Sequence, residues 1–151
     1  MTSSTATQSA DFRLTHQAFI DRILNDHDLD AVDELVGEDF HEQNPPPGMG
    51  AGRKGLRDFL ASMFAAFPDL RWDVKQSVAA DGCVAMWSVW SGTHRGEFMG
   101  IPATGRTVAV EAWTLDILRD GLLVESRILM DTMGMLTQLG ALPGPDAPPA
   151  G

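Results

Sequence analysis

Asp131 is the acidic residue whose surroundings best suit acid–base chemistry. It ends a predicted strand in the run Ile128-Leu129-Met130-Asp131-Thr132-Met133, where most of its neighbours are apolar. A carboxyl group withdrawn from water holds its proton more readily, which suits a general acid or base near neutral pH. An aspartate just before a predicted helical turn can instead cap that helix by accepting backbone N–H bonds. The sequence leaves both roles open.

His94 and His41 are the histidines that can assist such a residue. His94 ends a predicted central strand, where it can shuttle a proton near pH 7 or bond to the glycine-rich loop that follows. His41 shares one face of a short predicted strand with Gln43, because side chains alternate along a strand. If that face lines a cavity, both can orient a carbonyl or hydroxyl group; otherwise they are surface groups on an edge strand. His16 lies on the apolar stripe of the first predicted helix, which favours a core histidine.

The sequence offers no pattern typical of a metal or cofactor site. Cys83 is the single cysteine, which excludes an internal disulfide and a cysteine metal cluster. His41 and His94 have no second pair of ligands at metal-binding spacing. The run Gly48-Met49-Gly50 lacks the strand–turn–helix context of a phosphate loop, and no Gly-x-Ser-x-Gly elbow occurs. We therefore expect neither a metal nor a cofactor.

Length, charge and hydropathy narrow the class of protein further. A chain of 151 residues fits one domain, and a net charge of −10 disfavours binding to the phosphates of nucleic acids. No apolar run approaches the roughly 20 residues that a membrane span needs. The first residues lack the basic start and apolar stretch of a secretion signal. We expect a cytoplasmic protein that acts on a small molecule and binds neither nucleic acid nor membrane.

Helices come first along the chain, and strands follow. Apolar residues recur every three or four positions from Phe12 to Leu24, again around Val32, and from Leu56 to Phe67, which predicts helices. Alternating apolar residues and Asp-Gly turns predict the sheet. The predicted strands cover 39–44, 72–78, 83–94, 107–118 and 122–131, and a final helical turn covers 133–139.

This order of elements is typical of the α+β class. We predict a strongly curved antiparallel sheet wrapped over the N-terminal helices, forming a cone with an internal pocket. The folded domain is expected to cover residues 11–142. Residues 1–10, rich in Ser, Thr and Ala, and residues 143–151, rich in Pro, Gly and Ala, are expected to be disordered tails.

Several runs of residues, in this order, resemble the SnoaL-like polyketide cyclases. They are Asp39-Phe40 with Asn44-Pro45, Ala66-Phe67-Pro68-Asp69-Leu70, Gly92 to Arg106, Arg119-Asp120-Gly121, and Asp131 to Gly140. The resemblance implies a nuclear-transport-factor-like cone, commonly a homodimer, with a ligand cavity between sheet and helices. It also implies closure of a polyketide ring by intramolecular aldol condensation. In that reaction a side-chain base removes a proton between two carbonyls, without metal or cofactor.

The chain departs from that family at two positions. The acid–base aspartate of the anthracycline-type cyclases falls on Ile128, and their pocket histidine falls on Thr114. Isoleucine cannot carry a proton, and threonine can only hydrogen-bond at neutral pH. Either another side chain transfers the proton, or positioning does most of the work, or this member only binds its ligand.

We therefore predict a cyclase or isomerase of secondary metabolism, acting on a small apolar polyketide-like substrate by cofactor-free acid–base catalysis. The alternatives are a non-catalytic small-molecule-binding member of the same fold, an epoxide-opening cyclase or hydrolase, and a protein-interaction domain with an exposed apolar sheet face. The predicted catalytic residues are Asp131, His94 and His41. The predicted substrate-binding residues are Gln43, Asn44, Thr114, Trp113, Ile128, Met130 and Met63.

Overall fold

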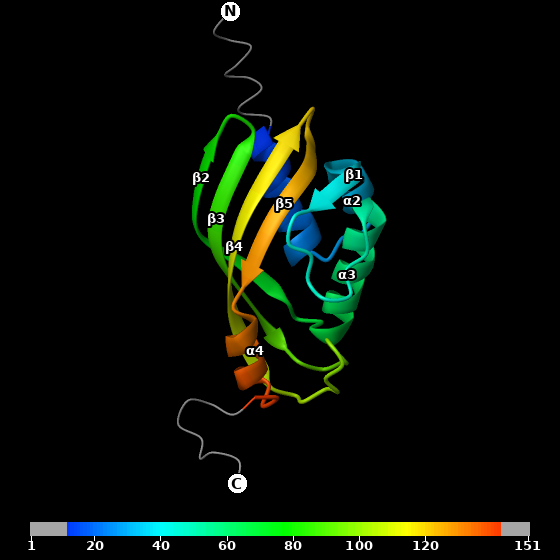
Figure 1. The fold of residues 1–151 in the computed structure, drawn as a ribbon, viewed down its shortest axis with the longest axis vertical. Helices are drawn as coiled ribbons and strands as arrows, with labels where there is room; N and C mark the ends of the chain where they lie inside the picture. Colours follow the sequence, from blue (N-terminus) through cyan, green and yellow to red (C-terminus); the bar gives the residue numbers. More distant parts are fainter. Residues whose placement is uncertain (1–11, 143–151) are drawn as a thin grey trace, which may run out of the picture.

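A curved five-stranded sheet forms one side of the molecule in this computed structural model, which describes residues 12–142 (Figure 1). The strand order is β1-β5-β4-β3-β2. The tails predicted at 1–10 and 143–151 lie outside the described residues. The strands are β1 (Val36–Glu42), β2 (Arg71–Ala80), β3 (Cys83–Thr93), β4 (Thr107–Arg119) and β5 (Leu122–Met130).

Strands β2 to β5 form the predicted antiparallel meander, and two tight turns fix its register. Asp81 and Gly82 join β2 to β3 with φ angles of 53° and 77°. Asp120 and Gly121 join β4 to β5 with φ angles of 51° and 75°. Positive φ at both central residues defines the type I′ turn, whose twist matches that of the flanking strands. The Asp-Gly pairs therefore act as the sequence predicts.

Strand β1 departs from the antiparallel prediction, because it runs parallel to β5. Parallel neighbours need a long connection, and here a helix and the other three strands lie between the two in sequence. The pairing places Glu42, the last residue of β1, opposite Ser126 in the middle of β5. A residue early in the chain thereby joins the inner surface of the meander.

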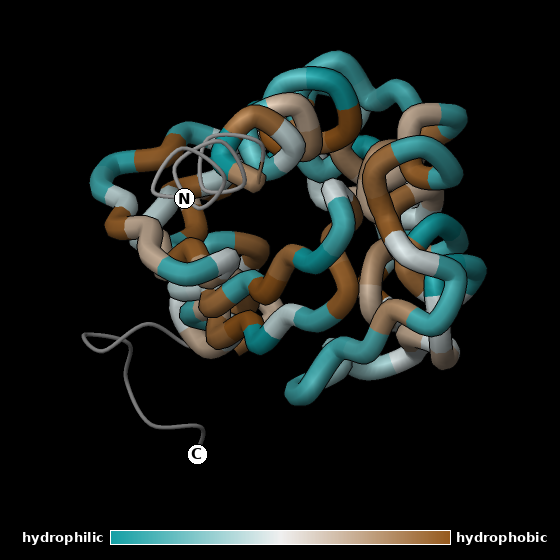
Figure 2. The backbone as a smooth tube through the Cα atoms, turned by 90° about the horizontal axis from the view of Figure 1, so that it is seen from above, coloured by the Kyte–Doolittle hydropathy of each residue, from teal (hydrophilic) through white to brown (hydrophobic). Residues whose placement is uncertain are grey.

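Helices cover the concave face of the sheet. An α-helix over 12–18 continues as the π-helical segment η1 (Phe19–Asn25), followed by α2 (Ala31–Leu35) and the longer α3 (Gly52–Ala66). Figure 2, seen from above, shows the sheet and these helices arranged around a common centre. The wider winding of a π-helix brings residues five apart toward one side. Phe19 and Leu24 are so spaced, and both line the cavity described below.

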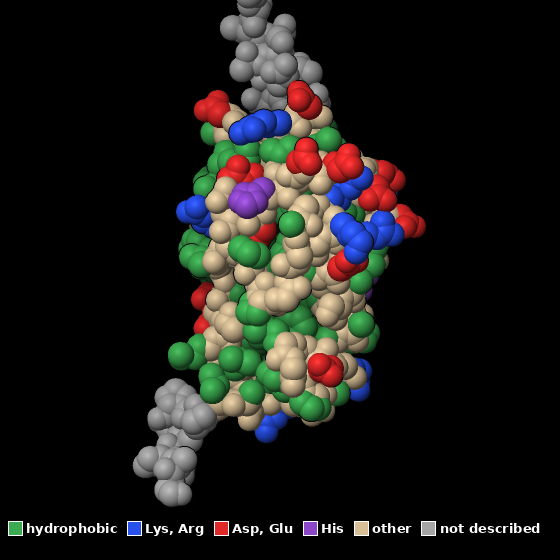
Figure 3. All heavy atoms as spheres, turned by 45° about the vertical axis from the view of Figure 1, so that its right-hand side comes forward, with side chains coloured by type: hydrophobic (Ala, Val, Ile, Leu, Met, Phe, Trp, Pro, Cys, Tyr) green, Lys and Arg blue, Asp and Glu red, His purple; other side chains and the backbone are tan. Residues whose placement is uncertain are grey.

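Ion pairs at the surface join α2 to α3. Arg57 contacts Asp30 and Asp33 at 3.1 Å each, and Arg53 contacts Asp33 at 3.4 Å. In Figure 3 the charged side chains gather over the upper part of this face, and hydrophobic ones are more frequent below. Exposed pairs contribute only about 0–1 kcal/mol each, so they orient α2 more than they stabilise the fold.

The short helix α4 (Thr132–Gln138) closes one end of the cone (Figure 1). The Gln138 amide bonds to both backbone groups of Ala109 in β4, at 2.7 Å and 3.0 Å, and Met135 is buried beneath the helix. These contacts dock α4 on the sheet. Within residues 12–142, none of the helices has the length and apolar character required to cross a membrane.

Candidate active site

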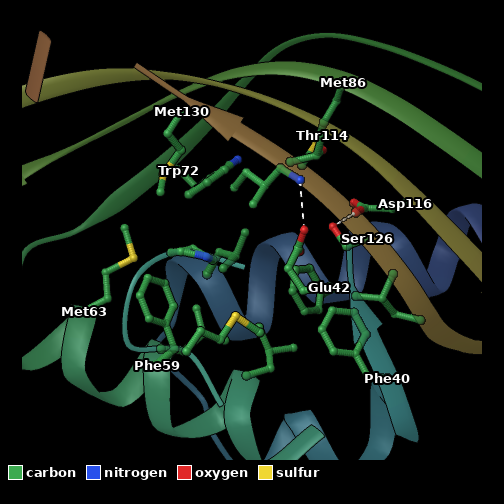
Figure 4. Close-up of a pocket in the computed structure, with 18 residues that line it drawn as sticks. Phe40, Glu42, Phe59, Met63, Trp72, Met86, Thr114, Asp116, Ser126 and Met130 are labelled. Atoms are coloured by element: carbon green, nitrogen blue, oxygen red, sulfur yellow. Dashed lines mark hydrogen bonds between the residues drawn. The ribbon is translucent and has the colours of Figure 1, made fainter. Parts of the chain in front are cut away.

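A small, mostly apolar cavity lies between the sheet and α3 (Figure 4). Its volume is about 80 Å³. Phe59 and Met63 of α3 line one side, and Met86, Thr114 and Met130 of the sheet line the side opposite. We call this space the inner cavity. Its walls are mostly apolar, so a charge inside it acts more strongly than at the surface.

A second hollow of about 180 Å³ adjoins the inner cavity. Pro46, Phe59, Ile128 and Met130 line both spaces and therefore form the boundary between them. Farther out, the second hollow is lined by the 44–47 segment, by Phe98 and Met99, and by the start of α4. We call it the outer chamber. Together the two spaces offer a larger ligand site than the inner cavity alone.

Three polar side chains stand in a row at one end of the inner cavity. Asp116 of β4 pairs with Ser126 of β5, and Ser126 pairs with Glu42 of β1, so the three residues occupy neighbouring strands at one level. All three line the inner cavity, and Figure 4 shows them close together beside its apolar walls. We call Asp116, Ser126 and Glu42 the polar row.

Glu42 is held by one of its two carboxylate oxygens. The backbone N–H groups of Asn44 and Ile128 donate to Oε1 at 3.0 Å and 3.1 Å. Hydrogen bonds from backbone N–H groups to a carboxylate are charge-assisted and fix its orientation. Within residues 12–142, Oε2 accepts no hydrogen bond, so it is available to a molecule in the inner cavity. A fixed carboxylate with one unused oxygen is suited to removing a proton.

Asp116 uses both of its oxygens within the protein. The Ser126 hydroxyl donates to Oδ1 at 2.6 Å, and His16 Nε2 lies 2.8 Å from Oδ2. Asp116 is only 3% exposed, and His16, on the helix over 12–18, is 7% exposed. The expectation that His16 is a satisfied core histidine is confirmed, with Asp116 as its partner. Burial raises the pKa of the nearby Cys83 thiol, and the charge of Asp116 raises it further.

Thr114 and Trp72 bring unused hydrogen-bonding groups to the inner cavity. Both residues line the cavity, and Thr114 Oγ1 and Trp72 Nε1 are buried without a partner among residues 12–142. A buried polar group left unpaired costs about 1–3 kcal/mol. A ligand with oxygen atoms at these points would remove that cost. The two groups are therefore suited to holding a carbonyl oxygen.

The structure brings five of the predicted substrate-binding residues to these spaces. Thr114, Ile128, Met130 and Met63 line the inner cavity, and Asn44 lines the outer chamber. The Asn44 amide donates to the backbone oxygen of Ile128 at 2.7 Å, which fixes the rim of the outer chamber. The two positions at which the chain departs from the family therefore lie in the cavity wall.

Asp131, the first predicted catalytic residue, lies outside both spaces. It is exposed and precedes α4, and its Oδ1 accepts the backbone N–H of Gly134 at 2.9 Å. This is the capping alternative. The apolar neighbours in the sequence do not surround Asp131, because alternation along β5 turns Leu129 to the surface, and Met133 is also exposed. The reason for expecting an acid–base role is thereby removed.

His94 lies in the core, away from the inner cavity. Its side chain is fully buried and stacks on Phe67, with ring centroids 5.4 Å apart. The backbone N–H of Thr104 donates to His94 Nδ1 at 3.2 Å, and the Thr104 hydroxyl lies 3.0 Å from the same nitrogen. His94 thus holds the loop between β3 and β4, which is the second of its two predicted roles.

His41, Gln43 and Trp113 lie on the outer side of the sheet. Phe40 and Glu42 face the inner cavity, so alternation turns His41 and Gln43 outward, where Gln43 donates to Glu125 at 2.7 Å. Trp113 is 58% exposed, because its neighbour Thr114 points inward. The predictions that placed these three residues in the cavity are wrong, because alternation along their strands turns their side chains away from it.

Sequence reasoning missed the polar row, although one signal for it was present. Asp116 follows Val110, Ala112 and Thr114 at period two, so a carboxylate occupies an inward position of β4. A buried acid on the apolar face of a strand points to a functional or paired group. For Glu42, the sequence did not show which side chains of β1 point inward. In the structure the burial of Phe40 decides this, and Glu42 lies on the same side. Ser126 carried no signal, because serine is tolerated on either face.

Comparison with known proteins identifies the family. The family model described as SnoaL-like polyketide cyclase matches residues 14–139, which spans nearly all of the described chain. No curated protein matches the sequence. Many solved structures share the fold.

Three solved structures from Streptomyces species illustrate the likeness. TsrD from Streptomyces laurentii is 26% identical with a TM-score of 0.79, and the match covers 88% of this chain and 97% of TsrD. IdmH from Streptomyces antibioticus, suggested to be a polyketide cyclase, is 32% identical with a TM-score of 0.74, covering 85% and 98%. AclR from Streptomyces galilaeus, suggested to be a hydroxylase, is 26% identical with a TM-score of 0.77, covering 89% and 99%. The chain belongs to the SnoaL-like polyketide cyclase family.

Proposed function

We propose that this protein is a cyclase or isomerase that acts on a small, largely apolar polyketide-like substrate by acid–base catalysis without a cofactor. The observation that carries the proposal is the carboxylate of Glu42 at one end of an apolar cavity. It is fixed through Oε1, and its Oε2 has no hydrogen-bond partner in the part of the chain that the structure describes. Membership of the family supports the substrate class. Glu42 replaces Asp131 as the residue proposed to transfer the proton.

In the proposed reaction, Glu42 Oε2 removes a proton from a carbon that lies between two carbonyl groups. The resulting enolate oxygen accepts hydrogen bonds from Thr114 or Trp72, whose donors have no partner among residues 12–142. Preorganised donors of this kind stabilise charge that develops during reaction. The enolate carbon then attacks a third carbonyl carbon, farther along the same molecule. A carbon–carbon bond forms, and the alkoxide oxygen takes up a proton.

The inner cavity and the outer chamber bind different parts of the substrate. The reacting carbons would occupy the inner cavity, near Glu42, while the rest of the chain extends past Ile128 and Met130 into the outer chamber. Confinement of a folded chain between apolar walls brings its reacting carbons together, and such positioning can supply much of a rate enhancement. A larger substrate therefore uses both spaces.

A ring-opening probe tests the proposed base directly. 5-Nitrobenzisoxazole is an aromatic carbon acid: removal of its C–H proton breaks the N–O bond and releases a coloured phenolate. General-base catalysis is worth about 10²–10⁴-fold, so Glu42→Gln is expected to lower kcat/KM at least 100-fold. The matched control is Glu125→Gln, which removes the carboxylate one residue from Ser126 on the outer face of β5.

The control is expected to keep kcat/KM within about two-fold of the unaltered protein. Equal activity of Glu42→Gln and the unaltered protein would contradict the proposal. The second candidate, a binding protein without catalysis, is favoured by the loss of the family's proton-transfer residues at Ile128 and Thr114. It predicts that the unaltered protein opens the probe no faster than free acetate does.

The homodimer, the cytoplasmic location and the lack of a cofactor, expected from the sequence, stay predictions.

The outer face of the sheet is where a second copy of the chain would bind. Trp113, Leu115 and Leu129 are exposed there on β4 and β5, at 58%, 44% and 61%. Sedimentation of the unaltered protein and of Trp113→Glu would test this, because a charge at the centre of an apolar interface favours the monomer.

A further inference from the structure

A chain of buried hydrogen bonds leads from the inner cavity to a separate hollow. Ser126 donates to Asp116 at 2.6 Å, and Asp116 pairs with His16 at 2.8 Å. Ser126 and Asp116 line the inner cavity, whereas His16 lines a hollow of about 430 Å³ between the first helix and strands β2 and β3. We call that hollow the far pocket. Its lining shares no residue with that of the inner cavity.

The geometry and burial of this chain favour proton transfer along it. Ser126 is 7% exposed, Asp116 3% and His16 7%, so bulk water does not compete for these bonds. Both distances lie in the range of strong hydrogen bonds to charged groups. Each residue can both give and take a proton.

We propose that His16, Asp116 and Ser126 form a proton relay between the far pocket and the inner cavity. The relay supplies the proton that the alkoxide needs after ring closure, so this use of it rests on the proposed function. His16 gives a proton from Nε2 to Asp116, and Asp116 gives one to the Ser126 oxygen. Ser126 gives its own proton to the alkoxide. One proton leaves doubly protonated His16, and one reaches the alkoxide. His16 then takes a proton from water in the far pocket. Glu42 releases to water on the side of the outer chamber the proton that it removed from the substrate, so the cycle takes up one proton and gives out one.

Three other ionisable side chains lie around the relay. Arg13 lines the far pocket beside His16, and its guanidinium donates to the backbone oxygen of Ala79 at 2.8 Å. Glu42 lies next to Ser126 on the inner side, and Cys83 is the titratable side chain of β3 near Asp116. The proposed base and the proposed source of the returning proton are thereby separate groups, so both can act in one catalytic cycle.

Nuclear magnetic resonance of the histidine rings tests the relay without turnover. The probe is phenol, whose hydroxyl can bond to Ser126, and the matched control is anisole, whose methoxy group cannot donate. His16→Gln identifies the His16 signal by its loss. If the relay operates, phenol is expected to move the pH midpoint of the His16 ring by about half a unit or more, while anisole leaves it within about 0.1 unit.

Variants decide between a relay and a merely structural pair. Ser126→Ala keeps the Asp116–His16 pair but removes the contact with the cavity, so phenol is expected to lose its effect on His16. Glu42→Gln is expected to keep the effect, which separates the relay from the proposed base. The proposal is overturned if phenol and anisole act equally, if phenol leaves the His16 midpoint unchanged at its solubility limit, or if Ser126→Ala responds like the unaltered protein.

Discussion

Two groups of polar residues in this molecule use similar side chains for different ends. The polar row holds Asp116, Ser126 and Glu42 at one end of the inner cavity. The second group, which we call the loop anchors, holds Asp131, His94 and Asp69 near α4 and the loop between β3 and β4. Carboxylates occur in both regions. What separates them is whether the side chain lines the inner cavity.

The loop anchors accept hydrogen bonds from nearby segments of the chain, and none of the three lines the inner cavity or the outer chamber. Asp131 accepts from Gly134, His94 accepts from Thr104, and Asp69 accepts from the backbone and hydroxyl of Thr93 at 2.7 Å each. These bonds hold the segments that carry the walls of the outer chamber. The polar row also forms hydrogen bonds, but Glu42 keeps one oxygen for the inner cavity. Residue type alone therefore does not reveal which acid can react.

Removal of Asp116 is expected to have the largest effect on stability in either group. Asp116→Ala leaves His16 and Ser126 without their buried partner, and breaking such a pair costs about 3–5 kcal/mol. Urea unfolding followed by fluorescence measures the change. A loss below about 1 kcal/mol would show that water replaces the carboxylate, and would remove the basis for treating the chain as dry.

Removal of Asp131 is expected to have a smaller effect, and only on stability. Asp131→Ala deletes the cap of α4, which is worth about 1 kcal/mol, whereas Asp131→Asn can still cap the helix. Both variants are expected to open 5-nitrobenzisoxazole at the rate of the unaltered protein. Unfolding and turnover are measured on the same samples. Loss of turnover in Asp131→Asn, without loss of stability, would return Asp131 to the active site.

The smallest expected effect is the contribution of the Asp69 carboxylate to stability, which depends on pH. Hydrogen bonds from the Thr93 backbone and then the Thr93 hydroxyl hold the pKa of Asp69 below its usual value of 3.8. A carboxylate with a lowered pKa in the folded state stabilises the fold above its unfolded pKa, and loses this contribution as pH falls through the folded pKa.

Asp69→Asn measures that contribution. The variant is expected to be less stable than the unaltered protein by about 1 kcal/mol at pH 6, because Asp69 is exposed and its bonds are partly screened. The difference is expected to shrink as the pH falls below about 4. Urea unfolding at several pH values checks it. A difference that stays constant down to pH 3 would mean that the Asp69 charge does not contribute.

Local patterns were sufficient to predict most of the fold. The two Asp-Gly turns and the alternation along β3 and β4 depend on residues close in sequence, and the structure follows them. The parallel pairing of β1 with β5 was not predictable, because it depends on contacts between distant segments. The π-helical winding of η1 was also not predicted, because the spacing of its apolar residues fits an α-helix as well.

The candidate site was harder to predict than the fold for the same reason. Thr114 and Ile128 line the inner cavity, as the family resemblance implies, and Met130 lies two residues after Ile128 on the same side of β5. The polar row forms only when three strands pair in one register, and Glu42 lies 86 residues before Ile128 of β5, to which it is hydrogen-bonded. A one-residue change of phase in β1 would exchange Glu42 for His41, which is the error that sequence reasoning made.

A crystal structure with a small 1,3-diketone tests the central claim most directly. The claim is that the reactive end of the ligand site is at the polar row and not at the loop anchors. With 2-acetylcyclopentanone, we predict an enol oxygen or the acidic carbon within about 3–3.5 Å of Glu42 Oε2, and a carbonyl oxygen facing Thr114. A diketone bound instead against Asp131 or His94, with the inner cavity empty, would contradict the claim.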